Sequence, residues 1–189
     1  HHAMICPGLG IEPDKLRIVQ NPTGGTFGYK FSPTMEALLG VACMATCRPV
    51  SLVYSMYQHI TYTGKRSPGF VNLKYGADKD GKLLAMESDW VIDHGPYSEF
   101  GDLLTLRQAQ FIGAGYDIKN IRGKGRTVCT NHAWGSAFRA YGSPQSFLAS
   151  EILMDELAEK MGVDPFELRY KNLYRPGATT PNGCKPDVY

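Results

Sequence analysis

Residues 70–92 read FVNLKYGADKDGKLLAMESDWVI, and this stretch predicts a β-hairpin. Its two arms, 70–75 and 82–92, are rich in β-branched and aromatic residues, which favour strands. Between them lies the turn sequence DKDG (78–81), whose Asp-Gly pair is typical of a tight connection between antiparallel strands. The turn therefore gives a strong prediction that the two arms pair.

Two helices are predicted on the C-terminal side of this hairpin. The first opens at Ser143, runs to about Met161 with apolar residues at helical spacing, and stops at Gly162, which suits a left-handed C-cap. The second begins at Asp164, which forms a capping-box pattern with Glu167. Both helices are therefore expected to have well-defined starts.

The remaining elements are predicted less directly. Strands are predicted at residues 15–20 (KLRIVQ), 50–54 (VSLVY) and, after the hairpin, 126–130. A helix is predicted from Ser32, as its N-cap, to about Cys47. Together the elements predict an α+β (mixed α/β) fold in which strands pack against capped helices.

The composition excludes several classes of protein. Of the 189 residues, 43% are hydrophobic and 20% are charged, and Lys and Arg number 20 against 18 for Asp and Glu. A disordered chain, a coiled coil and a polybasic nucleic-acid-binding protein are therefore poor fits, and no apolar run reaches the roughly 18 residues of a membrane span. The five cysteines form no CxxC pair, which favours a reducing compartment, the cytoplasm, with the periplasm as the alternative.

Glycine is abundant, with 21 residues, and two glycine-containing segments are candidates for close approach to a ligand. The segment 24–30 reads GGTFGYK and precedes the helix predicted at Ser32, and the segment 137–145 reads AFRAYGSPQ and leads into the helix predicted at Ser143. Backbone N–H groups at such positions can face an anion or an oxo group, and Arg139 adds a permanent positive charge. Two tight turns with aromatic residues packed into them are the alternative.

Other catalytic templates are not matched. Residues 63–66 (TGKR) resemble the end of a phosphate-binding loop, but Arg stands where that loop requires Ser or Thr. The histidines show no metal-ligand spacing, and His94 and His132 are interpreted as loop residues. Asp93 and Glu99 are interpreted as solvated or loop-bracing carboxylates.

Five segments together resemble the molybdenum-binding part of the xanthine oxidase family, and within it the bacterial molybdenum-containing aldehyde oxidoreductases. They are GGTFGYK (24–30), YTGKRSP (62–68), DHGPYSEFGDLL (93–104), NIRGKGR (120–126) and AFRAYGSPQ (137–145), in the family's order. Because the resemblance covers essentially the whole chain, residues 1–189 are interpreted as a partial molybdenum-cofactor-binding domain that lacks an N-terminal iron-sulfur part and a C-terminal part.

The resemblance implies a cofactor, a reaction and partners. The cofactor is molybdopterin with molybdenum, expected in the cytosine dinucleotide form. Two [2Fe-2S] clusters are expected in the missing N-terminal part, and they would pass electrons to an acceptor such as flavodoxin or ferredoxin. The implied reaction oxidises an aldehyde to a carboxylic acid with oxygen from water. The implied full-length protein is a homodimer without nucleic-acid partners or a membrane span.

The resemblance also assigns residues to the site. Those expected to bind the cofactor are Gly25, Thr26, Phe27, Gly28, Ala137, Phe138 and Arg139, with the Gly28 N–H facing an oxygen ligand of the metal. Those expected to line the substrate pocket are Phe31, Phe100, Leu103 and Tyr141. No side chain here is expected to ligate the metal or to act as catalytic base, because the family's general-base glutamate is expected beyond Tyr189. The chain alone is therefore expected to be inactive.

Phe31 distinguishes between substrate classes. The resemblance places it where purine-oxidising relatives have a glutamate, so an aromatic ring is expected to favour aldehydes. A purine or heterocycle hydroxylase is the first alternative. Arg107, which aligns with a substrate arginine of those enzymes, either contacts substrate or forms a structural ion pair. A non-catalytic module of the same fold, without cofactor, is the second alternative.

Two further positions carry expectations. Cys47 stands where the family usually has glycine at a helix end, so its side chain is expected to be mildly unfavourable in a left-handed cap. The glycine-punctuated stretch 95–125 offers little side-chain packing, and we expect neighbouring domains to order it.

Overall fold

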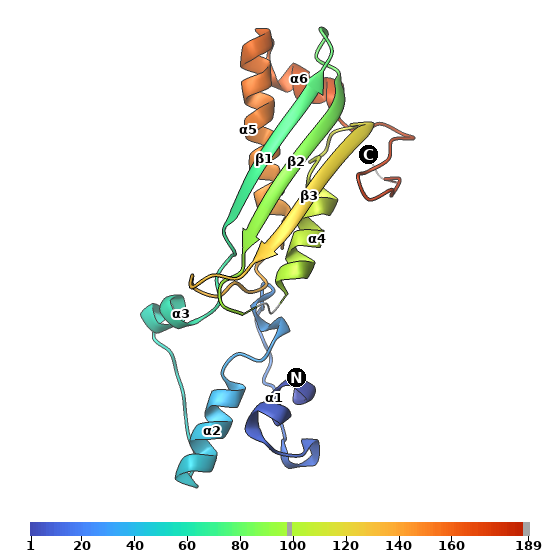
Figure 1. Ribbon diagram of the computed structural model, residues 1–189. Coiled ribbons are helices and arrows are strands. Elements are labelled where there is room, and N and C mark those ends of the chain that lie inside the picture. The colour runs from blue at the N-terminus through green and yellow to red at the C-terminus, as the bar shows by residue number, and fades with distance from the viewer. Residues whose placement is uncertain (98–99, 187–189) are drawn as a thin grey trace. The chain divides into compact units, whose positions relative to one another are not determined.

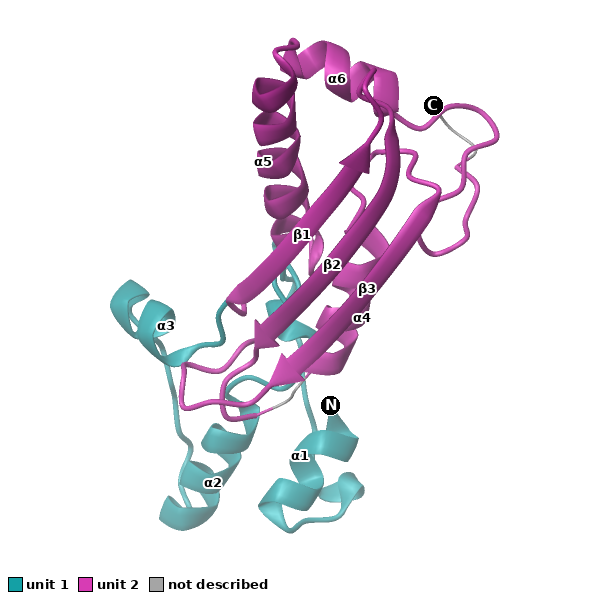
Figure 2. Ribbon diagram, turned by 45° about the horizontal axis from the view of Figure 1, so that its top comes forward, with its two compact units in different colours: residues 1–65, 136–139 teal, residues 66–135, 140–189 magenta. Residues whose placement is uncertain are grey.

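The computed structural model describes residues 1–97 and 100–186. The chain forms two compact units (Figure 2). Unit 1 contains residues 1–65 and 136–139, and unit 2 contains residues 66–135 and 140–189. Unit 1 is therefore built from two segments of chain, with most of unit 2 lying between them in the sequence.

A three-stranded sheet forms the framework of unit 2. Strands β1 (Gly69–Ala77) and β2 (Leu83–Asp93) pair antiparallel, which confirms the hairpin. The turn is closed by Asp78, whose Oδ1 accepts hydrogen bonds from the Asp80 and Lys82 N–H groups, each at 2.9 Å. Strand β3 (Asn120–Val128) pairs parallel with β2 and gives the order β1-β2-β3.

Helices α4 (Gly101–Phe111) and α5 (Ser143–Met161) pack on one face of this sheet (Figure 1). Helix α5 turns small serines toward α4, and the Ser146 and Ser150 hydroxyls donate to the carbonyls of Gln108 and Ile112 at 2.9 and 2.8 Å. Small residues at this spacing let the two backbones approach closely. The core between helices and sheet consists of Leu83, Met86, Trp90, Ile92, Leu104, Ile112, Tyr116, Ile118, Met154, Ala158 and Leu168.

The structure confirms the predicted boundaries of the two C-terminal helices. Helix α5 ends at Gly162, whose φ of 66° is left-handed. Helix α6 (Pro165–Asn172) is capped by the Asp164 carboxylate, which accepts hydrogen bonds from the Phe166 and Glu167 N–H groups at 2.8 and 3.0 Å. The mixed α/β fold class is thus confirmed.

The glycines of β3 have a local packing reason that the sequence expectation missed. Strand β3 was predicted only at 126–130, yet it starts at Asn120 because the Trp90 ring covers its glycines. A Cβ on Gly125 would lie 2.5 Å from the Trp90 ring, and one on Gly123 would lie 3.0 Å from it. Packing inside unit 2 therefore orders this part of the stretch 95–125. The expectation that neighbouring domains order the stretch is not needed for Gly123 and Gly125.

The buried Asn172 ties helix α6 to the hairpin turn. Its Oδ1 accepts a hydrogen bond from the Leu83 N–H at 2.8 Å, and its Nδ2 donates to the carbonyls of Gly81 and Leu168 at 2.8 and 2.9 Å. The side chain is fully buried, so removing it would leave the Leu83 N–H and the Gly81 carbonyl without this buried partner. Asn172 is therefore a structural residue of unit 2.

Unit 1 contains helices but no strand among residues 1–65, all of which are described. Its elements are α1 (His2–Leu9), η1 (Pro13–Lys15), η2 (Tyr29–Phe31), α2 (Glu36–Thr46) and α3 (Met56–Tyr62). The strands predicted at 15–20 and 50–54 are wrong, because an extended segment needs a neighbouring strand to satisfy its backbone groups. The part of the chain that the structure describes has no helix long and apolar enough to cross a membrane.

The start of α2 also differs from the prediction. Ser32 is not its N-cap but ends the 3-10 turn η2, and α2 begins at Glu36 after Met35. The Glu36 carboxylate, inside the helix, accepts a hydrogen bond from the Thr34 N–H at 2.6 Å. The backbone N–H of Thr34, just before the helix, therefore has a side-chain partner. The helix ends as expected at Cys47, whose φ of 51° is left-handed.

We predict that Gly125→Ala destabilises the β2-β3-α4 region by about 1–3 kcal/mol, because the added methyl group would overlap the Trp90 ring. Hydrogen exchange of the β3 amides, measured by mass spectrometry, reports this loss. Gly76→Ala in β1 is the control, since its Cβ would find its nearest neighbour at 3.8 Å. Equal protection in the two variants would contradict the packing role of Gly125.

We predict that Asn172→Ala lowers the free energy of unfolding of unit 2 by about 2 kcal/mol or more, because each buried group left unpaired costs about 1–3 kcal/mol. Denaturant-induced unfolding measures the change. Asn120→Ala is the control, since Asn120 donates one exposed hydrogen bond, to the Leu84 carbonyl at 2.9 Å. A cost for Asn172→Ala no larger than that of the control would show that the network is dispensable.

Candidate cofactor site

A pocket of about 680 Å³ lies within unit 1 and brings the two predicted glycine-containing segments together. Three stretches of chain line it. They contribute Gly25, Thr26, Phe27, Tyr29 and Lys30, then His59, Ile60, Thr63, Gly64 and Lys65, and finally Phe138 and Arg139. Five of the seven residues predicted to bind the cofactor therefore line one pocket, and Gly28 and Ala137 lie directly beside it in the sequence.

Close backbone approach joins the first and third stretches. Gly28 has a φ of 93°, and a Cβ there would lie 3.2 Å from the carbonyl carbon of Ala137. Ala137 is only 5% exposed. Any side chain at Gly28 would therefore be strained by its backbone conformation and would also meet a buried backbone.

The loop around Gly28 is held by its own backbone turns. The Tyr29 N–H donates to the Thr26 carbonyl at 3.0 Å, and the Phe31 N–H donates to the Gly28 carbonyl at 3.2 Å. The Gly28 N–H donates to the Thr26 hydroxyl at 3.4 Å, which is long for a hydrogen bond. This N–H is the one expected to face a ligand oxygen, and its present acceptor is a weak one.

The pocket is electropositive. Among the lining residues that the structure describes, Lys30, Lys65 and Arg139 are cations and none is a carboxylate. The Arg139 guanidinium lies over the Phe27 ring, 5.6 Å from its centroid, a distance at which a cation is attracted to the ring. The arrangement suits an anionic ligand with a flat apolar part.

The second stretch was not among the predicted site residues. Thr63 follows α3, is 5% exposed, and its hydroxyl donates to the His59 carbonyl at 2.6 Å. The Lys65 ammonium donates to the Thr63 carbonyl, and the Lys65 carbonyl accepts the Ser136 N–H at 2.9 Å. The sequence signal for this wall is the segment YTGKRSP (62–68), which resembles the family but contains none of the predicted site residues.

The residues predicted for the substrate pocket belong to different units. Phe31 lies in unit 1 and is 69% exposed. Phe100, Leu103 and Tyr141 lie in unit 2, where the Tyr141 hydroxyl donates to the Phe100 carbonyl at 2.5 Å and Leu103 lies on α4 with 45% exposure. The structure thus brings Phe100 and Tyr141 into contact with each other.

Gly142 has a packing reason of its own. Its φ is 93°, and a Cβ there would lie 2.9 Å from the Gln108 backbone nitrogen of α4. The glycine therefore allows α5 to start close to α4. This contact accounts for Gly142 without a ligand.

The other charged candidates have local partners. The Asp93 carboxylate accepts the Gly95 N–H at 3.0 Å and the Thr130 hydroxyl at 2.7 Å, and these hydrogen bonds lower its pKa. It therefore braces a loop, as the sequence suggested. Arg107 donates to Gln110 at 3.0 Å and lies over the Phe111 ring, so it forms no ion pair within the described part of the chain. Glu99 lies outside the described residues.

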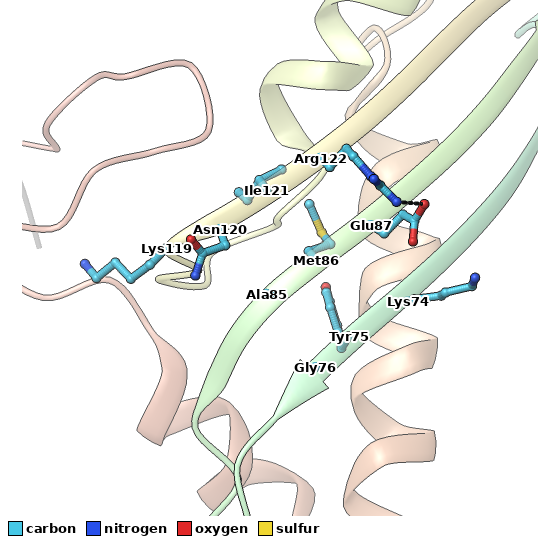
Figure 3. A pocket seen from close by; sticks show the side chains of 10 residues that line it. All are labelled: Lys74, Tyr75, Gly76, Ala85, Met86, Glu87, Lys119, Asn120, Ile121 and Arg122. Carbon is cyan, nitrogen blue, oxygen red and sulfur yellow. Dashed lines mark hydrogen bonds and ion pairs between the residues drawn. The ribbon is translucent and has the colours of Figure 1, made fainter.

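A second hollow, of about 600 Å³, lies on the outer face of the sheet (Figure 3). Lys74, Glu87 and Arg122 follow one another across the three strands, and Arg122 and Glu87 form an ion pair at 2.7 Å. Figure 3 shows these two side chains pointing toward each other. Since its charges include an exposed ion pair and it has no close backbone approach like that of Gly28, this hollow is a solvated sheet face.

Comparison with known proteins agrees with the geometry. Residues 1–173 match the family model of the molybdopterin cofactor-binding domain. The aldehyde oxidoreductase of Megalodesulfovibrio gigas is 70% identical over all 189 residues, which span 21% of that protein. The nicotinate dehydrogenase large molybdopterin subunit of Eubacterium barkeri is 33% identical over 93% of the chain and 41% of its own length.

Solved structures give the same result. The aldehyde oxidoreductase from Desulfovibrio gigas superposes with a TM-score of 0.92 at 70% identity, over the whole chain and 21% of that structure. The enzyme of the same name from Desulfovibrio desulfuricans ATCC 27774 also gives 0.92, at 67% identity and with the same coverage. The chain thus spans about a fifth of the length of these two relatives. From the matched domain and this identity, the chain belongs to the molybdopterin cofactor-binding domain family, within the xanthine oxidase family.

Proposed function

We propose that the pocket of unit 1 binds molybdopterin and that the natural protein oxidises aldehydes to carboxylic acids with oxygen from water. The observation that carries the proposal is the meeting of the 25–30 and 138–139 segments in one electropositive pocket. The 70% identity to an aldehyde oxidoreductase along the whole chain supports the choice of reaction.

The residues present fit a molybdopterin group. Molybdopterin has a flat pterin ring and a phosphate group, so its binding needs close backbone approach, apolar faces and positive charge. The backbone at Gly28 meets the first need, and the Phe27 and Phe138 rings, which are 62% and 45% exposed, meet the second. Lys65 and Arg139 meet the third.

The chain's own residues would orient the cofactor and exclude water. Backbone N–H groups of the Gly25–Gly28 loop would donate hydrogen bonds to it, with Gly28 exchanging its long bond to Thr26 for a better acceptor. The Arg139 guanidinium stays positively charged at any physiological pH, so it would bind a negatively charged group of the cofactor. When bound, the cofactor would supply the two-electron redox chemistry of the reaction.

The side chains that the family resemblance assigns to the substrate pocket support the choice of aldehydes. Phe31, Phe100, Leu103 and Tyr141 offer aromatic and aliphatic surface, with no carboxylate to recognise a polar heterocycle. We propose these four residues as the walls of the substrate pocket. Arg107 is then a surface residue of α4 rather than a substrate contact.

The finer assignments rest on the family resemblance. We propose the cytosine dinucleotide form of the cofactor, two [2Fe-2S] clusters, a flavodoxin or ferredoxin as electron acceptor, a general-base glutamate outside residues 1–189, and a homodimer. All five cysteines are unpaired, and four are exposed, which supports a reducing compartment such as the cytoplasm.

Metal and pterin analysis of the purified natural protein, together with activity assays, tests the proposal. We expect molybdenum and pterin in equal amounts, with turnover of benzaldehyde but not of hypoxanthine. Turnover of hypoxanthine alone would move the function to the purine hydroxylases. Well-folded protein with neither molybdenum nor pterin would show a non-catalytic module.

We predict that Gly28→Ala lowers molybdopterin content about tenfold or more, because a left-handed alanine and its contact with the Ala137 backbone together cost at least about 1.4 kcal/mol. Fluorescence of the oxidised pterin released from purified protein measures the content. Gly24→Ala is the control, since its Cβ would find no atom within 4 Å. Equal pterin content in both variants would remove Gly28 from the site.

A further inference from the structure

His94 is a fully buried titratable residue that the proposed function does not use. It directly follows β2, and its Nδ1 lies 2.6 Å from the Ser67 hydroxyl. Its backbone is also fixed, because its N–H donates to the Val128 carbonyl at 3.0 Å and its carbonyl accepts the Gly135 N–H at 2.9 Å. His94 therefore joins the end of β2 to two parts of unit 2 that are far from each other in the sequence, Ser67 and residues 128–135.

Two glycines leave room for the imidazole. A Cβ on Gly135 would lie 2.5 Å from His94 Nδ1 and 2.1 Å from the Ser67 hydroxyl. A Cβ on Gly101, the first residue of α4, would lie 2.9 Å from His94 Cγ. The ring is thus enclosed so tightly that no larger residue is accommodated at either glycine.

The segments that His94 joins continue directly into the pocket walls. Ser67 comes two residues after Lys65, which lines the pocket. Gly135 comes directly before Ser136, which begins the stretch containing Phe138 and Arg139. In unit 1 the same two stretches are joined by the hydrogen bond from the Ser136 N–H to the Lys65 carbonyl. The two stretches that lead into the pocket are therefore held together by two neighbouring sets of contacts. One is the hydrogen bond between Ser136 and Lys65, and the other is formed by His94 with Ser67 and Gly135.

We propose that His94 is a positioning residue for the cofactor pocket, which it serves by holding Ser67 and Gly135 at the ends of the two segments that form the pocket walls. The identity of the ligand rests on the proposed function, but the positioning role does not. No contact between His94 and the cofactor is required.

The protonation state of His94 agrees with this role. Burial lowers its pKa, and the nearby carboxylates of Asp102 and Asp93 act in the opposite direction. Its Nε2 is buried and has no hydrogen-bond partner within the described residues, so a second ring proton would have no acceptor there. The neutral ring is therefore the form that fits the enclosure.

The test compares variants of the natural holoprotein. His94→Ala removes the ring, whereas His94→Asn keeps an amide that can reach the Ser67 hydroxyl from the position of Nδ1. His132→Asn is the matched control, because His132 is an exposed histidine of the neighbouring loop. Asn172→Ala is a second control, which destabilises unit 2 through α6 and the hairpin turn.

Two readouts are measured on each purified variant. One is the rate at which molybdopterin is released, followed by the fluorescence of the oxidised pterin. The other is hydrogen exchange of residues 63–68 and 133–139. For His94→Ala we expect release at least tenfold faster and faster exchange in both segments. We expect His94→Asn to recover most of the effect, and His132→Asn and Asn172→Ala to leave release unchanged.

Three outcomes would overturn the proposal. The first is release and exchange in His94→Ala equal to those of the parent. The second is an equal acceleration in Asn172→Ala, which would show a general loss of stability. The third is failure of His94→Asn to recover either readout. If the parent protein holds no molybdopterin, the proposed function fails, and hydrogen exchange in the two segments then decides the role of His94 by the same criteria.

Discussion

Backbone-to-backbone contact between Gly28 and Ala137 is the constraint on which the candidate site depends. It joins two segments more than a hundred residues apart in the sequence, and a side chain at Gly28 would be strained by the φ of 93° and would place its Cβ 3.2 Å from the Ala137 carbonyl carbon. Phe27 and Lys30 belong to the first of these segments and Phe138 and Arg139 to the second, whereas Lys65 lies on the third stretch that lines the pocket. The arrangement of the first four residues is thus set by how closely two stretches of main chain approach.

Unit 2 uses glycine in the same way but for packing. Trp90 covers Gly123 and Gly125, and the start of α5 lies against α4 at Gly142. Much of the glycine excess is therefore explained by large side chains and helices that press on main chain inside the unit. Both uses follow from one property, the absence of a Cβ atom, and only the neighbouring residues distinguish a ligand site from a core.

The elements predicted correctly are those whose ends are marked by turn or capping residues in the local sequence. The hairpin has an Asp-Gly turn, α5 has Gly162 at its end, and α6 has the Asp164 cap, so none of them needs distant residues to define it. The strands predicted at 15–20 and 50–54 failed because strand formation depends on a partner, which unit 1 does not provide. Helix α4 was not predicted because its buried residues are Gly101, Leu104 and Gln108, of which only Leu104 is a large apolar side chain, so its sequence shows little helical apolar spacing.

The candidate site was predictable only in part for a similar reason. The resemblance gave Gly25–Gly28 and residues 137–139, and the pocket of unit 1 unites these two stretches. Thr63 and Lys65 were not predicted as site residues because the TGKR sequence matches no complete ligand-binding motif, and only the fold brings them to the pocket wall. His94 does lie in a loop, but its full burial could not be predicted, because it depends on contact with Gly135, which is 41 residues further along the chain.

The division of unit 1 into two segments has a consequence for biosynthesis. The ribosome makes residues 1–65 first, but one wall of the pocket is residues 136–139, which follow the whole three-stranded sheet. The nascent chain therefore cannot form the pocket until β1, β2, α4 and β3 have all been synthesised. A ligand that contacts all three stretches of the pocket wall can therefore meet them together only after that point.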